Sequence, residues 1–189
     1  MSWFRRTRKP SAAEIVNGAE SICTNCTETH HGMFDLAAIA PDPWPGKQTY
    51  APNSELSLDG DFLSEDFCVL EGRNFLVRCV LEIPVVGMEQ LFGLGCWGTL
   101  SRANFEDYIA RFDDADYAGV GPWTSWLCND LLGLVGTKPI GCWMFLQLDR
   151  QRPTLRVQEE GQALAQLQKS GLEPEQVIEI YRNFGHSVG

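Results

Sequence analysis

The pattern of hydrophobic and polar residues becomes regular from about residue 66. Residues 67–70 and 74–83 are rich in β-forming side chains, and the Glu-Gly-Arg sequence between them is typical of a tight hairpin turn. Residues 91–100 have the same character and follow after a short connection. The pattern therefore predicts three consecutive strands.

Helical spacing of apolar residues is clearest between residues 105 and 112, where they recur every three or four positions. This spacing puts them on one face of a helix that is capped by Ser101. A Ser-x-x-Glu capping box predicts a short helix from residue 11. Two further helices are predicted near residues 162–169 and 174–184.

A second hairpin is predicted for residues 140–148 and 154–157. Strands joined by hairpins, and not by crossover helices, favour an antiparallel sheet. A chain of 189 residues fits one domain. We therefore expect a single α+β domain over residues 11–189, with helices packed on a central antiparallel sheet.

The charge is unevenly distributed. The net charge is −10, and the first ten residues carry three arginines and one lysine, which leaves −14 on the rest. Residues 1–10 are predicted to be a basic flexible arm. An acidic body repels phosphate, so nucleic-acid binding is not expected. The same charge suits a basic protein partner, although ordinary solubility explains it equally well.

Composition places the chain among ordinary globular proteins, with 44% hydrophobic and 21% charged residues. No apolar run reaches the roughly 20 residues that a membrane-spanning helix needs. No apolar stretch follows the basic arm, so a signal peptide is not expected. We therefore expect a cytoplasmic protein with reduced thiols and no membrane contact. The sequence does not indicate an oligomeric state.

The clearest chemical motif is Cys23-Thr-Asn-Cys26-Thr-Glu-Thr-His30. Two thiols separated by two residues can bind one metal ion, and an imidazole four positions later can supply a third ligand. Zinc is the metal that such donors favour, and His31 is a reserve ligand. Inert cysteines and a redox pair are the alternatives. A redox pair would favour a strand before the motif and a helix starting within it, and neither is predicted.

Several segments together are typical of one bacterial family. They are the cysteine motif, Asp66-Phe-Cys68-Val-Leu, residues 75–84, residues 95–105 and Gly121-Pro122-Trp-Thr-Ser-Trp-Leu. Over residues 20 to 180 the chain resembles the family catalogued as domain of unknown function 2199. The resemblance implies a domain identity and no activity.

The resemblance also bears on the predicted zinc site. Cys68 recurs in the family, and this implies that it is the fourth ligand beside Cys23, Cys26 and His30. Thr27 departs from the family, which usually has glycine there; glycine tolerates the positive φ of such turns better. A histidine that the family tends to carry before the C-terminal Leu-Ala is absent from this chain.

Three classes of function remain open. Trp97, Trp123, Trp126 and Trp143 make the middle of the chain aromatic, and such residues fill a core or line a binding site. The chain lacks GxxxxGK[ST], HExxH and GxSxG. We therefore expect a non-enzymatic binding or regulatory protein. The alternatives are a metal-dependent enzyme with an open Cys/Cys/His zinc site and a small-ligand binder that uses an aromatic pocket.

Overall fold

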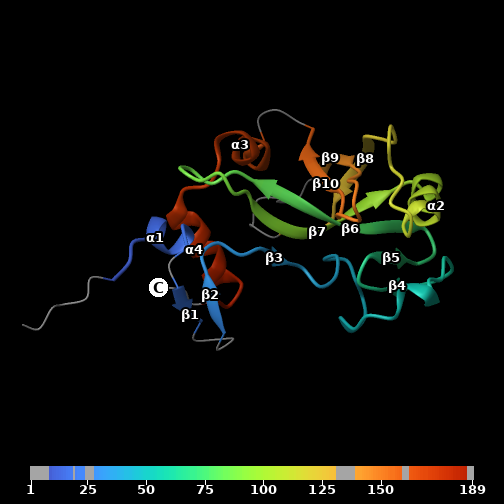
Figure 1. The fold of residues 1–189 in the computed structure, drawn as a ribbon. Coiled ribbons are helices and arrows are strands. Elements are labelled where there is room, and N and C mark those ends of the chain that lie inside the picture. The colour runs from blue at the N-terminus through green and yellow to red at the C-terminus, as the bar shows by residue number, and fades with distance from the viewer. Residues whose placement is uncertain (1–8, 19, 24–27, 131–138, 159–161, 187–189) are drawn as a thin grey trace, which may run out of the picture.

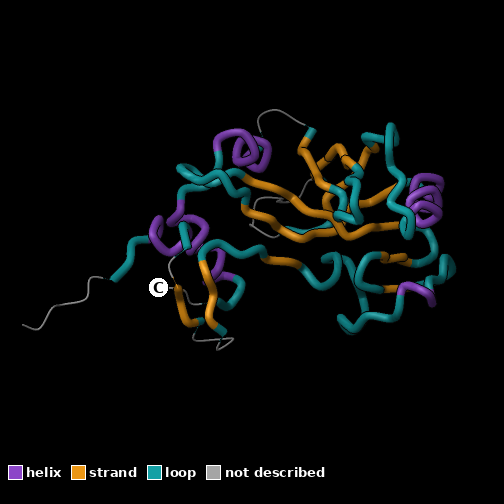
Figure 2. Tube along the Cα trace, in the orientation of Figure 1, coloured by secondary structure: helices purple, strands orange, loops and turns teal. Residues whose placement is uncertain are grey.

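The computed structural model describes residues 9–18, 20–23, 28–130, 139–158 and 162–186. Figure 1 shows the arrangement of its elements, and Figure 2 separates helix, strand and loop. The helices are α1 (Ala12–Val16), η1 (Asn53–Glu55, a 3-10 turn), α2 (Arg102–Arg111), α3 (Ala163–Ser170) and α4 (Pro174–Asn183). The strands are β1 (Glu20–Ile22), β2 (Thr29–His31), β3 (Leu36–Ala37), β4 (Phe62–Leu63), β5 (Phe67–Leu70), β6 (Asn74–Ile83), β7 (Phe92–Leu100), β8 (Trp123–Leu127), β9 (Ile140–Phe145) and β10 (Thr154–Val157).

Five strands form a closed barrel. β6 to β10 lie side by side in sequence order as antiparallel neighbours, and β10 returns to pair with β6 in parallel. The mixture of helices and strands was predicted correctly, and so were the β5–β6 and β9–β10 hairpins. The central sheet is closed into a barrel, which corrects the expected plain antiparallel sheet.

The length of β6 explains the closure. Its first half pairs with β5, and Val80 and Leu81 in its second half pair with β10 on the same edge. A hairpin turn in the sequence indicates only that two consecutive strands pair with each other. The parallel β10–β6 contact joins residues that are far apart in the chain, so no local pattern predicts it.

Side chains fill the barrel. The inward-facing residues Cys79, Cys96, Cys142 and Met144 are fully buried. α2 covers one end through Phe105 and Tyr108, as its helical spacing predicts, and Ser101 caps it by accepting a hydrogen bond from the Asn104 N–H. The barrel interior is therefore an apolar core that contains several thiols.

The tryptophans divide between core and surface. Trp97 is fully buried, whereas Trp126 and Trp143 are 54% and 42% exposed on the outer side of β8 and β9. The aromatic middle of the chain is thus a core only in part.

α1, β1, β2 and α4 gather at the end of the molecule away from α2 (Figure 1). β1 and β2 form a separate two-stranded antiparallel sheet. The capping box that Ser11 and Glu14 predict is present at the start of α1. Residues 1–8 of the expected basic arm lie outside the described residues. Within the described part of the chain, no helix is both long enough and apolar enough to span a membrane.

Candidate metal centre

The β1–β2 hairpin positions Cys23 and His30. Ser21 pairs with His30 across the two strands, and the Cys23 N–H donates to the Glu28 carbonyl at 2.9 Å, which extends the ladder by one residue. Successive strand residues point to opposite sides. His30 is accordingly half-buried, whereas the His31 side chain is 71% exposed and lies 3.9 Å from Glu20. His31, the expected reserve ligand, therefore faces away from this site.

The C-terminal end of α4 supplies the second imidazole. After α4 the chain turns back, and the His186 N–H donates to the Tyr181 carbonyl at 2.8 Å. This turn places the half-buried His186 side chain beside the hairpin, although His186 follows Cys23 by 163 positions.

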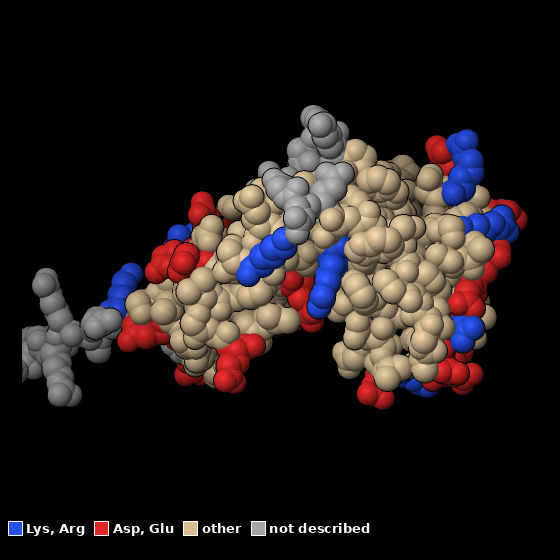
Figure 3. Space-filling model, turned by 90° about the horizontal axis from the view of Figure 1, so that it is seen from above, with Lys and Arg blue, Asp and Glu red and all other residues tan. Residues whose placement is uncertain are grey.

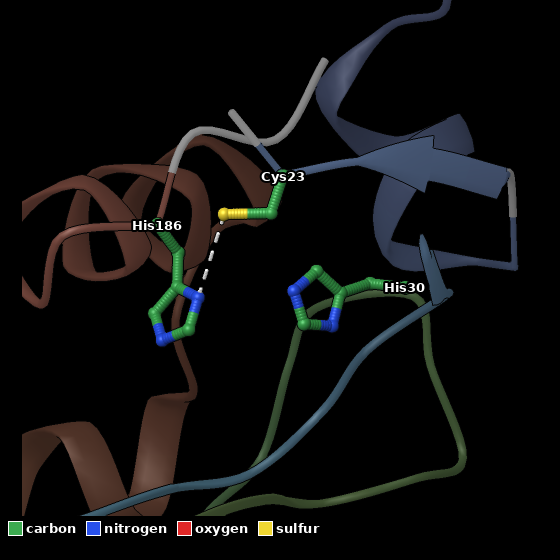
Figure 4. Close-up of side chains that lie close together, drawn as sticks. All are labelled: Cys23, His30 and His186. Carbon is green, nitrogen blue, oxygen red and sulfur yellow. Dashed lines mark hydrogen bonds between the residues drawn. The ribbon is translucent and has the colours of Figure 1, made fainter. Parts of the chain in front are cut away.

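One potential ligand atom from each of Cys23, His30 and His186 lies within 4.8 Å of the other two. Figure 4 shows the three side chains pointing toward one another from the hairpin and from the end of α4. Cys23 Sγ lies 3.7 Å from Nδ1 of His186, and Cys23 is fully buried. Among the described residues, no other group of three such side chains converges in this way.

An aromatic stack holds the two halves of the site together. The His30 ring stacks on Phe34 with centroids 4.0 Å apart, and Phe34 stacks on Tyr181 at 4.1 Å. The Tyr181 hydroxyl donates to the Phe34 carbonyl at 2.8 Å and accepts from its N–H at 2.9 Å. Burial raises the pKa of Tyr181 to about 12. The segment after β2 is thus fixed to α4 next to the metal-ligand candidates.

Of the four ligands expected from the sequence, two lie together, one is outside the described residues and one lies elsewhere in the fold. Cys23 and His30 lie together, and Cys26 falls outside the described residues. Cys68 is not part of the group: it is buried in β5 against Leu63 and Leu76, near α2 at the other end of the molecule (Figure 1). Pairing of β5 with β4 and β6 fixes it there. Burial also raises the pKa of the Cys68 thiol to about 12, so that it is neutral at physiological pH.

The sequence analysis did not select His186 as a candidate ligand. The described chain has three histidines, and no spacing rule connects the last of them to Cys23. The sequence indicated His186 only in that it is one of three histidines in the chain.

The geometry suits a tetrahedral ion. For zinc bonds of about 2.3 Å to sulfur and about 2.0–2.1 Å to nitrogen, neighbouring ligand atoms lie roughly 3.3–3.7 Å apart. The 3.7 Å between Cys23 Sγ and His186 Nδ1 already matches such an edge. The spread of up to 4.8 Å in the group requires small side-chain rotations. Thiolate and imidazole donors suit zinc, and they also bind other transition metals.

The Cys23 side chain is fully buried, so its sulfur is shielded from larger molecules. The described residues form clefts of about 620 and 470 Å³, and neither includes Cys23, His30 or His186 in its lining. A buried thiol near an imidazole has the composition of a nucleophile and its base, yet a substrate needs a path to the sulfur. The geometry therefore fits a bound ion better than a nucleophilic centre.

The family model for an uncharacterized protein conserved in bacteria (DUF2199) matches residues 22–172. The matched part contains Cys23 and His30 and ends before α4 and His186. No curated protein and no solved structure is detectably similar to the chain. The resemblance inferred from the cysteine motif and the strand segments is thereby confirmed: the chain belongs to the DUF2199 family of uncharacterized bacterial proteins.

Proposed function

We propose that Cys23, His30 and His186 bind one zinc ion that has a structural role. The observation that carries the proposal is the convergence of their ligand atoms to within 4.8 Å from two distant parts of the chain. An ion held there connects the β1–β2 hairpin to the end of α4. Structural zinc sites act by such cross-links and contribute directly to folding free energy.

The burial of Cys23 supports a structural role over a catalytic one. A catalytic zinc site keeps one coordination position open to water and substrate. Here the sulfur is fully buried, and the ring of Phe34 covers His30 at 4.0 Å. We propose accordingly that this is a binding or regulatory protein whose fold is stabilised by zinc.

The fourth ligand is still a sequence prediction. Cys26 follows Cys23 by three positions, which is the spacing of zinc-binding cysteine pairs. With Cys26 the site is a closed set of two thiolates and two imidazoles. Without it, water takes the fourth position, and the metal-dependent enzyme becomes the better hypothesis.

Metal analysis tests the proposal. We expect untagged protein to contain one zinc per chain. His30→Gln should lower zinc affinity by about a hundredfold or more, because it removes a direct ligand. His31→Gln is the matched control, since His31 is the exposed neighbour of His30 on the same strand, and it should leave affinity unchanged. Equal losses in the two variants, or wild-type protein without metal affinity, would contradict the proposal.

Cobalt substitution distinguishes the closed site from the open one. The thiolate-to-cobalt absorption counts the bound sulfurs, and the visible bands report whether the ion has four or five ligands. We expect Cys26→Ser to lose about half of the thiolate absorption. An unchanged spectrum would show that Cys23 is the sole bound sulfur and would favour the open site.

A further inference from the structure

A cleft lies beside β6, at the point where β5 and β10 separate. The cleft of about 620 Å³ opens where β5 and β10 leave the same edge of β6, and α2 and the turn before β10 border it. This volume is within the range of ligand-binding clefts, about 300–1,000 Å³. Half-buried Phe112 supplies aromatic surface, with the buried Tyr108 and Tyr117 behind it. Asp35, Asp66, Glu82 and Asp113 supply carboxylates.

The arginines in the cleft already have partners in the protein. Arg152 donates to Glu65 at 2.9 Å and to Asp66 at 3.2 Å, which joins the start of β10 to the start of β5. Arg150 donates to the main-chain carbonyl of Asp113 at 2.8 Å. The Asp66 charge is thus balanced within the protein.

Two other carboxylates of the cleft, Asp35 and Glu82, lack such a partner among the described residues. Asp35 and Glu82 are both exposed and meet at Gly93: Glu82 pairs with Gly93 across β6 and β7, and Asp35 Oδ1 accepts the Gly93 N–H at 2.9 Å. A side chain at position 93 would collide with Asp35, because its Cβ would lie 2.6 Å from that carboxylate. No described lysine or arginine forms an ion pair with Asp35 or Glu82, and Asp35 Oδ2 accepts no hydrogen bond from the described residues.

The spacing of these carboxylates selects the kind of cation. The cleft carboxylates are absent from the groups in which three described ligand atoms lie within 4.8 Å of one another. They do not converge on a metal ion, which needs several oxygens at about 2.0–2.6 Å. A larger cation with several donors and a flat face can reach separated carboxylates and aromatic walls.

We propose that this cleft binds an arginine side chain of a basic protein partner, with Asp35 and Glu82 as the acceptors of its guanidinium group. Guanidinium forms paired hydrogen bonds to carboxylates and also contacts aromatic rings favourably. Asp35 and Glu82 offer the carboxylates, and half-buried Phe112 offers aromatic surface in the same cleft. Acidic side chains are spread over the face in Figure 3 and do not gather into one patch, so the net charge alone does not locate a site. The cleft adds shape and aromatic surface to that charge. The proposal is independent of zinc at Cys23.

A labelled Gly-Arg-Gly-Arg-Gly peptide tests the proposal on the full chain by fluorescence anisotropy at low salt. The matched peptide has citrulline in place of arginine, which keeps the size and removes the charge. We expect the arginine peptide to bind at least tenfold more tightly. Zinc content measured on the same samples keeps this result separate from that of the metal centre.

Variants locate the binding. Asp35→Asn with Glu82→Gln keeps hydrogen-bond acceptors but removes two charges, and should weaken binding by about tenfold or more. The control is the pair Glu175→Gln and Glu179→Gln, two exposed carboxylates on α4 outside the cleft lining, which should change affinity less than twofold. Equal weakening by both pairs, equal binding of the citrulline peptide, or no binding by wild type would overturn the proposal.

Discussion

Cysteines occur in two contrasting regions of this protein. At the junction of the β1–β2 hairpin and α4, Cys23 lies among two imidazoles. In the barrel, Cys79 faces Cys96 across β6 and β7, with the two sulfurs 3.7 Å apart, and Cys142 is also fully buried nearby. Both regions bury their thiols, so burial alone does not separate them. The neighbours do: imidazoles in one region, apolar strands in the other.

The surroundings of the barrel thiols favour the protonated form. Burial raises the pKa of Cys142 to about 12, and it also raises the pKa of Cys79 well above its usual value, with Cys96 as the next cause. A thiolate is the species that binds metal or attacks a substrate. The barrel cysteines therefore act as small hydrophobic residues, and Cys23 is the better candidate for a metal ligand.

Removal of the metal should give the largest difference between the two regions. If zinc holds the hairpin to α4, chelation should release the amides of β1 and β2, with hydrogen exchange about a hundredfold faster. The amides of β6 and β7 lie in the barrel, so their exchange should change only a few-fold. Hydrogen exchange measured with and without chelator provides the comparison.

A matched pair of variants controls for general loosening. Cys23→Ser should give the fast hairpin exchange without any chelator. Cys128→Ser should not, because it changes a thiol directly after β8 whose N–H donates to Trp97 in β7 of the barrel. If the barrel amides accelerate as much as the hairpin amides, the metal stabilises the whole molecule and the two regions are not independent.

Sequence patterns indicated one half of the candidate metal centre and did not indicate the other. Cys23 and His30 lie within one hairpin, so local spacing was enough to pair them. Cys68 was selected because it recurs in the family, yet strand pairing fixes it in β5 with its side chain against Leu76. His186 reaches the site through the packing of α4, which is a tertiary event that spacing rules do not describe.

The same limit applies to the fold, in which local contacts were predictable from the sequence and the long-range contact was not. Hairpins and the amphipathic face of α2 follow from neighbouring residues, and both are present. Barrel closure depends on the contact of Thr154 and Leu155 with β6, between segments separated by three other strands. Long-range pairing is decided by the whole chain, so the open-sheet prediction failed at that contact.

Alkaline pH should weaken the barrel region. The folded-state pKa of Cys142 is about 12, above the usual value of 9.0, so the unfolded chain loses this proton first as pH rises. The stabilisation is complete below about pH 9 and is lost toward pH 12, at about 1.4 kcal/mol per pH unit for each such thiol. Urea unfolding at a series of pH values measures the slope.

The matched variant for the pH experiment is Cys142→Ala, which removes one titrating thiol from the barrel. Its unfolding free energy should fall less steeply above pH 9 than that of wild type. An identical slope in the two proteins would mean that other groups, such as buried tyrosines, cause the alkaline loss.

Crowding inside the barrel should have a smaller effect. A Cβ at Gly98 would lie 2.6 Å from Ser125 Oγ and 2.8 Å from the Met144 methyl group, so Gly98→Ala should cost about 1–3 kcal/mol of unfolding free energy. Ser125→Ala should recover part of this loss, because it removes the nearer atom. That buried hydroxyl also has no hydrogen-bond partner among the described residues. Zinc affinity should stay constant, since the change lies in the barrel; a parallel loss of zinc would couple the two regions.

The smallest expected effect tests the link between the hairpin and α4. Tyr181→Phe keeps the ring stacked on Phe34 but removes both hydrogen bonds to the Phe34 main chain. The loss should be about 1 kcal/mol, and zinc affinity should fall about fivefold if that energy holds His30 in place. Tyr117→Phe is the matched control, because its hydroxyl donates to the Tyr108 carbonyl at the barrel end. It should lower stability by a similar amount with zinc affinity unchanged. Since both changes remove one buried hydroxyl, a difference in zinc affinity isolates the positioning of His30 from general stability, and equal affinities would show that Tyr181 does not act on the metal centre.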